Sequence, residues 1–167
     1  MKFMSIILGL PIFFGCQNNK EKVSIDPHPE EIELNKKETD SLWQKALNGG
    51  DFDAYEKISE NYLDTYRFYD LYYYSLIMAN KYQCPKAYEH LYYILHESIT
   101  INGVKMKSND EITNNMAKFY LMKSVELGNK DAESFSREIF GDSIPPLESG
   151  YFLRKIEDEY RKLERMP

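Results

Sequence analysis

From Thr39 onward, hydrophobic residues recur at intervals of three and four along nearly the whole chain, with polar residues between them. This spacing places hydrophobic side chains on one face of an α-helix. It predicts seven successive helices whose inner faces carry Leu42, Trp43, Ala46 and Leu47; Ala54, Ile58 and Tyr62; Leu71, Tyr74 and Met78; Ala87, Leu91, Ile94 and Leu95; Met116, Ala117, Tyr120, Leu121, Ser124 and Leu127; Ala132, Phe135 and Ile139; and Phe152, Ile156, Tyr160 and Leu163. We therefore expect an all-α fold.

Turn and cap residues mark the boundaries of these helices. Gly50 ends the first helix and Asp51 caps the second. Pro85 stands at a first-turn position and opens the fourth. Ser108 and Glu111 form a capping-box pattern that opens the fifth. Between the fourth and fifth helices, Asn-Gly at 102–103 with short apolar flanks predicts a small β-hairpin.

A repeated segment links the predicted helices. Residues 50–54 match residues 128–132 in their glycine, an aspartate and an alanine, and a small residue, Ala46 or Ser124, precedes each glycine by four positions. A degenerate third copy contains Ala87, so Ala54, Ala87 and Ala132 are spaced by 33 and then 45 residues. The small residue allows two helices to approach closely, the glycine ends one helix in a left-handed turn, and the aspartate caps the next.

This pattern resembles Sel1-like repeats, relatives of the tetratricopeptide repeat, whose motif is Ala-x-x-x-Gly-(Asn/Asp)-x-x-Ala. Residues 46–54 and 124–132 carry it, and 117–121 resembles the Ala-x-x-(Tyr/Trp)-(Tyr/Leu) part of the same repeat. The glycine-rich loop of such units is absent, and the middle copy lacks its glycine. The resemblance covers 39–140 and implies an α-α superhelix of about three helix pairs plus a C-terminal helix, in a repeat domain at 39–167. A plain antiparallel helical bundle is the alternative.

The N-terminus has the composition of a secretory signal peptide at 1–15. A basic start precedes an apolar run from Phe3 to Gly15, which is shorter than the roughly 20 residues that a membrane-spanning helix needs. The tetrapeptide at 13–16 resembles the lipobox of bacterial lipoproteins, although Leu is usual where Phe13 stands. The resemblance implies that Cys16 is lipidated by acyl chains such as palmitate. The alternative is a leader that is simply cleaved, in which Cys16 is inert.

Residues 16–38 are polar and contain two prolines, which predicts a flexible tether between the lipid and the repeat domain. The expected location is therefore the bacterial cell envelope, lipid-anchored in the outer membrane on its periplasmic or surface side. Cys84 has no partner once Cys16 is lipidated, so no intramolecular disulfide can form. We expect Cys84 to be a small buried residue beside the start of a helix.

The charge of the chain argues against nucleic-acid binding. The formal net charge is −6 and no basic block is present, so a phosphate backbone would be repelled. Tyrosine is unusually abundant, with 14 residues. Tyrosines are rigid, amphipathic anchors at protein interfaces. Because neighbours on a helix point about 100° apart, some of these rings pack inside and others face solvent. We expect Tyr69, Tyr72 and Tyr73 to form a groove that binds a protein or peptide partner.

The sequence shows no catalytic or metal-binding pattern. His90 and His96 lie six residues apart on one helix and face nearly opposite directions, whereas a zinc pair is spaced by four. No phosphate-binding glycine loop, nucleophile elbow or cysteine pair is found, so no metal, cofactor or enzymatic activity is expected. The alternative is an envelope hydrolase that uses Glu89, His90 and His96.

We therefore expect a non-catalytic, lipid-tethered scaffold that binds a protein or peptide in the envelope. One version is an immunity protein against a toxin, because a small acidic helical repeat suits occlusion of a basic active site.

Overall fold

The fold is taken from a computed structural model that describes residues 34–96, 100–101, 104–105, 109–141 and 148–165. The chain divides into two units, Met1–Glu31 and Ile32–Pro167, and every described residue belongs to the second. The expected signal peptide and Cys16 lie outside the described residues. No helix in the described part is long and apolar enough to cross a membrane.

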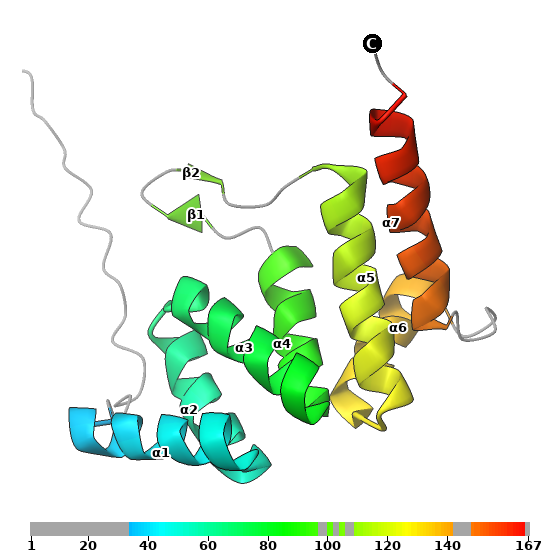
Figure 1. The fold of residues 1–167 in the computed structure, drawn as a ribbon. Coiled ribbons are helices and arrows are strands. Elements are labelled where there is room, and N and C mark those ends of the chain that lie inside the picture. The colour runs from blue at the N-terminus through cyan, green and yellow to red at the C-terminus, as the bar shows by residue number, and fades with distance from the viewer. Residues whose placement is uncertain (1–33, 97–99, 102–103, 106–108, 142–147, 166–167) are drawn as a thin grey trace, which may run out of the picture. The chain divides into compact units, whose positions relative to one another are not determined.

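The described residues form seven helices and one short hairpin (Figure 1), which confirms the predicted all-α fold. Their bounds are α1 (Lys36–Gly49), α2 (Phe52–Asp64), α3 (Phe68–Tyr82), α4 (Pro85–His96), β1 (Thr100–Ile101), β2 (Val104–Lys105), α5 (Glu111–Glu126), α6 (Lys130–Phe140) and α7 (Ser149–Leu163).

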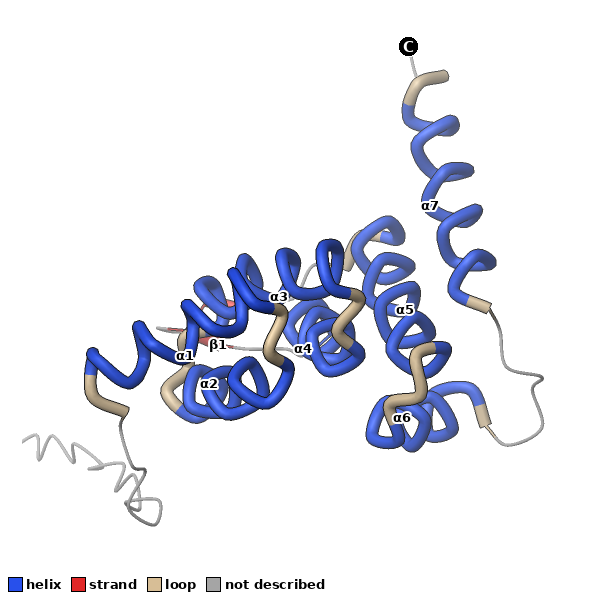
Figure 2. The backbone as a smooth tube through the Cα atoms, turned by 60° about the horizontal axis from the view of Figure 1, so that its bottom comes forward, coloured by secondary structure: helices blue, strands red, loops and turns tan. Residues whose placement is uncertain are grey.

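The helices form an α-α superhelix of three pairs, α1–α2, α3–α4 and α5–α6, followed by α7. Each helix packs on the next from α1 to α6, and α1 also contacts α3 (Figure 2). The last helix, α7, packs on α5. Helix α5 is therefore enclosed on two sides, by α4 on one and by α7 on the other.

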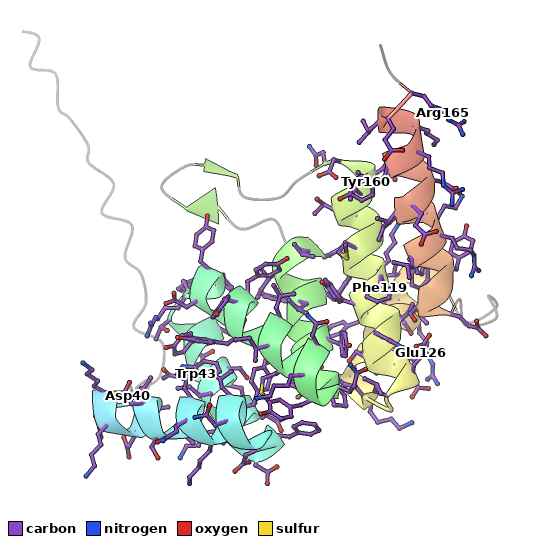
Figure 3. All side chains as sticks on the ribbon, viewed as in Figure 1. Asp40, Trp43, Phe119, Glu126, Tyr160 and Arg165 are labelled. Carbon is purple, nitrogen blue, oxygen red and sulfur yellow. The ribbon has the colours of Figure 1, made fainter. Side chains whose placement is uncertain are left out.

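The core of the first two pairs is rich in aromatic rings. Trp43 points from α1 toward α2 and α3 (Figure 3) and lies against Tyr55, Tyr62 and Tyr74, with ring centroids 6.2, 5.1 and 4.0 Å away. Edge-on and tilted contacts of this kind contribute about 0.5–1.5 kcal/mol each beyond the burial of the rings. The aromatic cluster therefore joins three helices around one tryptophan.

The turn between the two helices of each pair contains one residue with a left-handed φ. Gly50 and Gly128 have left-handed φ values of 68° and 88°, and Gln83 takes the same conformation with φ 55°. Asp51 and Asn129 then cap α2 and α6 by accepting a hydrogen bond from the N–H three residues later, and the cap at Asp51 was predicted. In the middle copy a glutamine thus occupies the left-handed position that the sequence pattern assigns to glycine.

The small residues of the repeat are buried in all three copies. Ala46, Ala79 and Ser124 precede the three left-handed turns by four residues and are fully buried. Ala54, Ala87 and Ala132, on the second helix of each pair, are buried as well. The same spacings of 33 and 45 residues thus relate the buried small residues, the left-handed residues and the buried alanines.

Two helix starts differ from the prediction. Helix α1 begins at Lys36, inside the expected tether 16–38, because Asn35 and Glu38 form a capping box there. Helix α5 begins at Glu111, where Asp110 and not Ser108 is the N-cap and accepts a hydrogen bond from the Thr113 N–H. Ser108 lies outside the described residues. At the start of α5, Ser108 and Asp110 are both acceptable N-cap residues, and the sequence alone did not distinguish between them.

The predicted hairpin is confirmed by the antiparallel pairing of Thr100 with Lys105 and of Ile101 with Val104. Pro85 is the first residue of α4, also as predicted, and Cys84 before it is a buried free thiol.

Several residues expected on inner faces are in fact exposed. Helices α6 and α7 contact the rest of the unit through few hydrophobic residues, among them Ala132, Phe152 and Ile156. The periodicity identified their hydrophobic stripes correctly, but it could not show how much of each stripe a neighbouring helix covers. The side chains left exposed are Leu127, Phe135, Ile139, Tyr160 and Leu163.

Candidate partner-binding site

The three tyrosines proposed for a groove all lie on α3, but they do not share one face. Tyr69 and Tyr73 are one turn apart and are 64% and 62% exposed. Tyr72 is partly buried and packs against the hydrophobic core. It lies near Tyr120, whose pKa burial raises to about 12, with Tyr72 adding to that rise. The candidate surface therefore consists of Tyr69 and Tyr73, while Tyr72 contributes to packing.

A third exposed ring, Tyr66, lies just before α3 and was not selected from the sequence. Its side chain is 69% exposed, and its backbone has a left-handed φ of 57°, which is unusual for a bulky residue. Its ring contacts Phe68, with centroids 5.9 Å apart. Nothing local in the sequence signals this backbone conformation. The structure thus adds one aromatic side chain to the exposed surface at the start of α3.

Arg67 and Asp70 form an ion pair across the first turn of α3. The Arg67 guanidinium donates to the Asp70 carboxylate at 2.8 Å and lies 4.0 Å above the centroid of the Tyr62 ring. The hydrogen bond to Asp70 raises the pKa of Arg67. This pair connects the exposed beginning of α3 to the aromatic cluster beneath it.

Four residues of α3 form an outward stripe, which we call the α3 stripe: Asp70, Tyr73, Ile77 and Lys81. Their spacing of three, four and four places them on one face of the helix. Asp70, Tyr73 and Lys81 are exposed, and Ile77 is partly exposed. The stripe therefore has an apolar centre with an acidic residue at one end and a basic residue at the other.

His90 lies in a buried polar cluster that joins three helices. The Tyr55 hydroxyl is 2.7 Å from Ser75 Oγ and 2.9 Å from His90 Nδ1. His90 is 2% exposed, and burial, with a smaller contribution from the charge of Lys86, lowers its pKa to about 3. The imidazole is therefore neutral at physiological pH and serves as a hydrogen-bonding partner inside the core.

Glu89 has hydrogen-bond partners different from those of His90. Its carboxylate accepts hydrogen bonds from Lys86 Nζ at 3.0 Å and from Asn129 Nδ2 at 2.5 Å. Asn129 also caps α6, so Glu89 connects α4 to the α5–α6 turn. His96 stacks on Tyr92, with ring centroids 4.9 Å apart. Glu89, His90 and His96 thus make three separate sets of contacts and do not meet in one site.

No group of three or more histidine, cysteine, aspartate or glutamate residues in the described part of the chain could hold a metal ion. The chain was compared with protein-family models, with curated proteins and with solved structures, and none of the three comparisons found a match.

Proposed function

We propose that this chain is a membrane-anchored bacterial lipoprotein whose helical repeats bind a protein or peptide partner in the cell envelope without catalysing a reaction. The observation that carries the proposal is the row of exposed aromatic side chains on and before α3, namely Tyr66, Tyr69 and Tyr73. Grouped exposed apolar surface of this kind marks interaction sites, and tyrosine is enriched among the residues that dominate binding energy.

The contacts of Glu89 and His90 favour binding over hydrolysis. Both side chains are buried, and each is bonded to another part of the fold. A catalytic acid or base must reach a substrate, whereas these two groups connect helices to one another. The hydrolase alternative would require both to leave their present partners.

The proposed anchor rests on the sequence at 1–16 and the proposed repeat class on the motif at 46–54 and 124–132. The left-handed turns at Gly50, Gln83 and Gly128, each four residues after a buried small residue, support a Sel1-like assignment. Several buried acyl chains on Cys16 would hold the chain stably at a membrane, at about 0.8 kcal/mol for each methylene.

Replacing Cys16 tests the anchor. We expect Cys16→Ser to move the full chain from the membrane fraction to the soluble fraction, and mass spectrometry of the wild-type N-terminus to show acyl chains on Cys16. Cys84→Ser is the matched control and should stay in the membrane fraction. An unmodified wild-type chain that still begins with Met1 would contradict the anchor.

Capture from detergent-solubilised membranes tests the binding site. We expect Tyr73→Ala to lower recovery of the specific partner at least about tenfold, because a buried interface aromatic commonly contributes 2 kcal/mol or more. Tyr160→Ala is the control, since Tyr160 is also exposed but lies on α7. Equal recovery with both variants, or no reproducible partner at all, would count against the proposed site.

A further inference from the structure

The repeat spacing identifies the residues on α1 and α5 that are equivalent to the α3 stripe. Subtracting 33 gives Lys37, Asp40, Gln44 and Asn48 on α1, and adding 45 gives Asn115, Lys118, Met122 and Glu126 on α5. The same helix face is therefore present three times in the described domain, once in each helix pair. Its composition and surroundings differ in each.

On α5, α7 covers part of this face, while Lys118 is partly exposed and Glu126 is exposed. Met122 is 3% exposed and Asn115 is buried. The Glu126 carboxylate accepts a hydrogen bond from the Ser149 N–H at 2.7 Å and another from the Ser149 hydroxyl at 2.9 Å. Because α7 starts beside the end of α5, the two helices run antiparallel (Figures 1 and 3). In the third pair, an antiparallel helix thus packs on this face.

On α1, the equivalent face is entirely polar and exposed, and Figure 3 shows Asp40 on the outside of the helix. Such a face is stable in water. On α3, the centre of the face is Tyr73 and Ile77, and the corresponding residues on α5 are Lys118 and Met122. The position of Ile77 and Met122 is therefore apolar on both helices, whereas the position of Tyr73 is charged on α5. Helix α3 therefore presents a more apolar centre than the equivalent face of α5, and its tyrosine remains in solvent.

The charges at the two ends of the α3 stripe are opposite, and both are exposed. Within one chain, Asp70 also pairs with Arg67, and Lys81 Nζ donates to the Leu47 carbonyl oxygen at 3.3 Å. Asp70 and Lys81 are about 16 Å apart along the helix, at 1.5 Å per residue. If two α3 helices lie antiparallel, Asp70 of each faces Lys81 of the other, and Tyr73 of each lies beside Ile77 of the other. One register satisfies both charge pairs and both apolar contacts, as a two-fold interface requires.

We propose that the partner seated on the α3 stripe is a second copy of this chain, whose own α3 lies antiparallel in the position that α7 takes on α5. This inference rests on the proposed function, since the α3 stripe shares Tyr73 with the proposed binding site and the inference names its occupant. One helix face buries less than the about 800 Å² per partner of a typical stable interface. Confinement of lipid-anchored copies to one membrane raises their effective concentration, so this contact suits the anchored protein.

Photo-crosslinking in native membranes tests the proposal with the full chain. A benzophenone amino acid in place of Tyr73 should crosslink the chain to a second copy of itself, at the segment around Ile77. Asp70→Lys and Lys81→Glu should each lower the yield of crosslinked dimer about tenfold, because like charges then face each other. The double variant Asp70→Lys, Lys81→Glu should restore the wild-type yield within about twofold.

The stability of α3 provides an internal control. Both substitutions place the wrong charge at an end of the helix dipole, so the double variant should be less stable than either single variant. Recovery of the dimer by the least stable variant therefore reports on the charge pairing between copies. A benzophenone in place of Tyr160 on α7 should give no crosslinked dimer.

Three outcomes would overturn the inference. A crosslink from position 73 to a different protein would exclude the second copy as occupant and leave the proposed function standing. No crosslink to any protein would contradict both. A crosslinked dimer whose yield the charge exchange fails to restore would exclude the antiparallel arrangement.

Discussion

At Gly50, the backbone and its surroundings both require glycine. The residue has a φ of 68°, and a Cβ added there would lie 2.6 Å from Cδ1 of Tyr82. The Tyr82 hydroxyl donates to the carbonyl oxygens of Leu47 and Asn48 at 2.8 and 2.9 Å. Tyr82 thus packs over the first turn and bonds to the end of α1. Gly128 has a similar φ of 88° but no atom within 4 Å of such a Cβ.

Gly50→Ala and Gly128→Ala should therefore differ in cost. The left-handed conformation penalises alanine by about 1 kcal/mol at both positions. At Gly50 the displacement of Tyr82 and its hydrogen bonds adds about 1–2 kcal/mol more. Urea unfolding of the two variants measures the difference in the free energy of unfolding. Equal losses would show that Tyr82 moves aside without cost.

His90 makes the stability of the fold depend on pH. Its pKa is about 3 in the folded chain, against an ordinary value of 6.5. Between these values the unfolded chain binds a proton that the folded chain does not. The stabilisation is complete above pH 6.5 and is lost as the pH falls toward 3, with a limiting slope of about 1.4 kcal/mol per pH unit.

His90→Gln should remove this dependence, because glutamine stays neutral and can still bond to Tyr55. From pH 6.5 down to about 5, the wild-type chain should lose about 1–2 kcal/mol more of its free energy of unfolding than the variant does. Urea unfolding at several pH values in this window measures it. The window lies above the range in which carboxylates become protonated. Parallel pH profiles for the two chains would contradict the buried, neutral histidine.

At the level of elements, α7 is held by a cap from another helix. Its N-cap residue, Glu148, makes no side-chain cap hydrogen bond. Glu126 of α5 supplies the acceptor for the Ser149 N–H instead. Burial alone would raise the pKa of Glu126, but the hydrogen bonds from Ser149 and the pairing with Lys123 outweigh it, and the pKa is lowered. The carboxylate thus stabilises the first turn of α7 while it is ionised.

Glu126→Gln should loosen α7 without unfolding the rest of the domain. The loss of the charged acceptor should cost about 1–2 kcal/mol, and faster amide hydrogen exchange across residues 149–163 measures it. Glu133→Gln is the control, because Glu133 forms exposed ion pairs within α6 alone. Unchanged exchange in α7 would show that its packing on α5 suffices without this cap.

The helix pattern also shows where prediction from sequence stops. Tyr72 and Tyr73 are adjacent, and the periodicity required at least one of such neighbours to pack inside. It could not assign Tyr72 to the core and Tyr73 to solvent, because that depends on where α3 lies against the other helices. The same holds for Phe135 and Ile139 on α6. The sequence identified their hydrophobic stripe, but it could not show that no neighbouring helix buries these two side chains.

For the molecule as a whole, the sequence alone determined the helical class, most helix boundaries, the helix ends at Gly50 and Gly128 and the similarity between the segments around them. These features depend on residues within a few positions of one another, so local patterns specify them. Only the tertiary structure decided that Gln83 takes the left-handed turn, that His90 bonds to Tyr55, and that α7 covers on α5 part of the face that α3 leaves open. Each of these depends on side chains brought together from distant parts of the chain, and packing selects among choices that local sequence leaves equal.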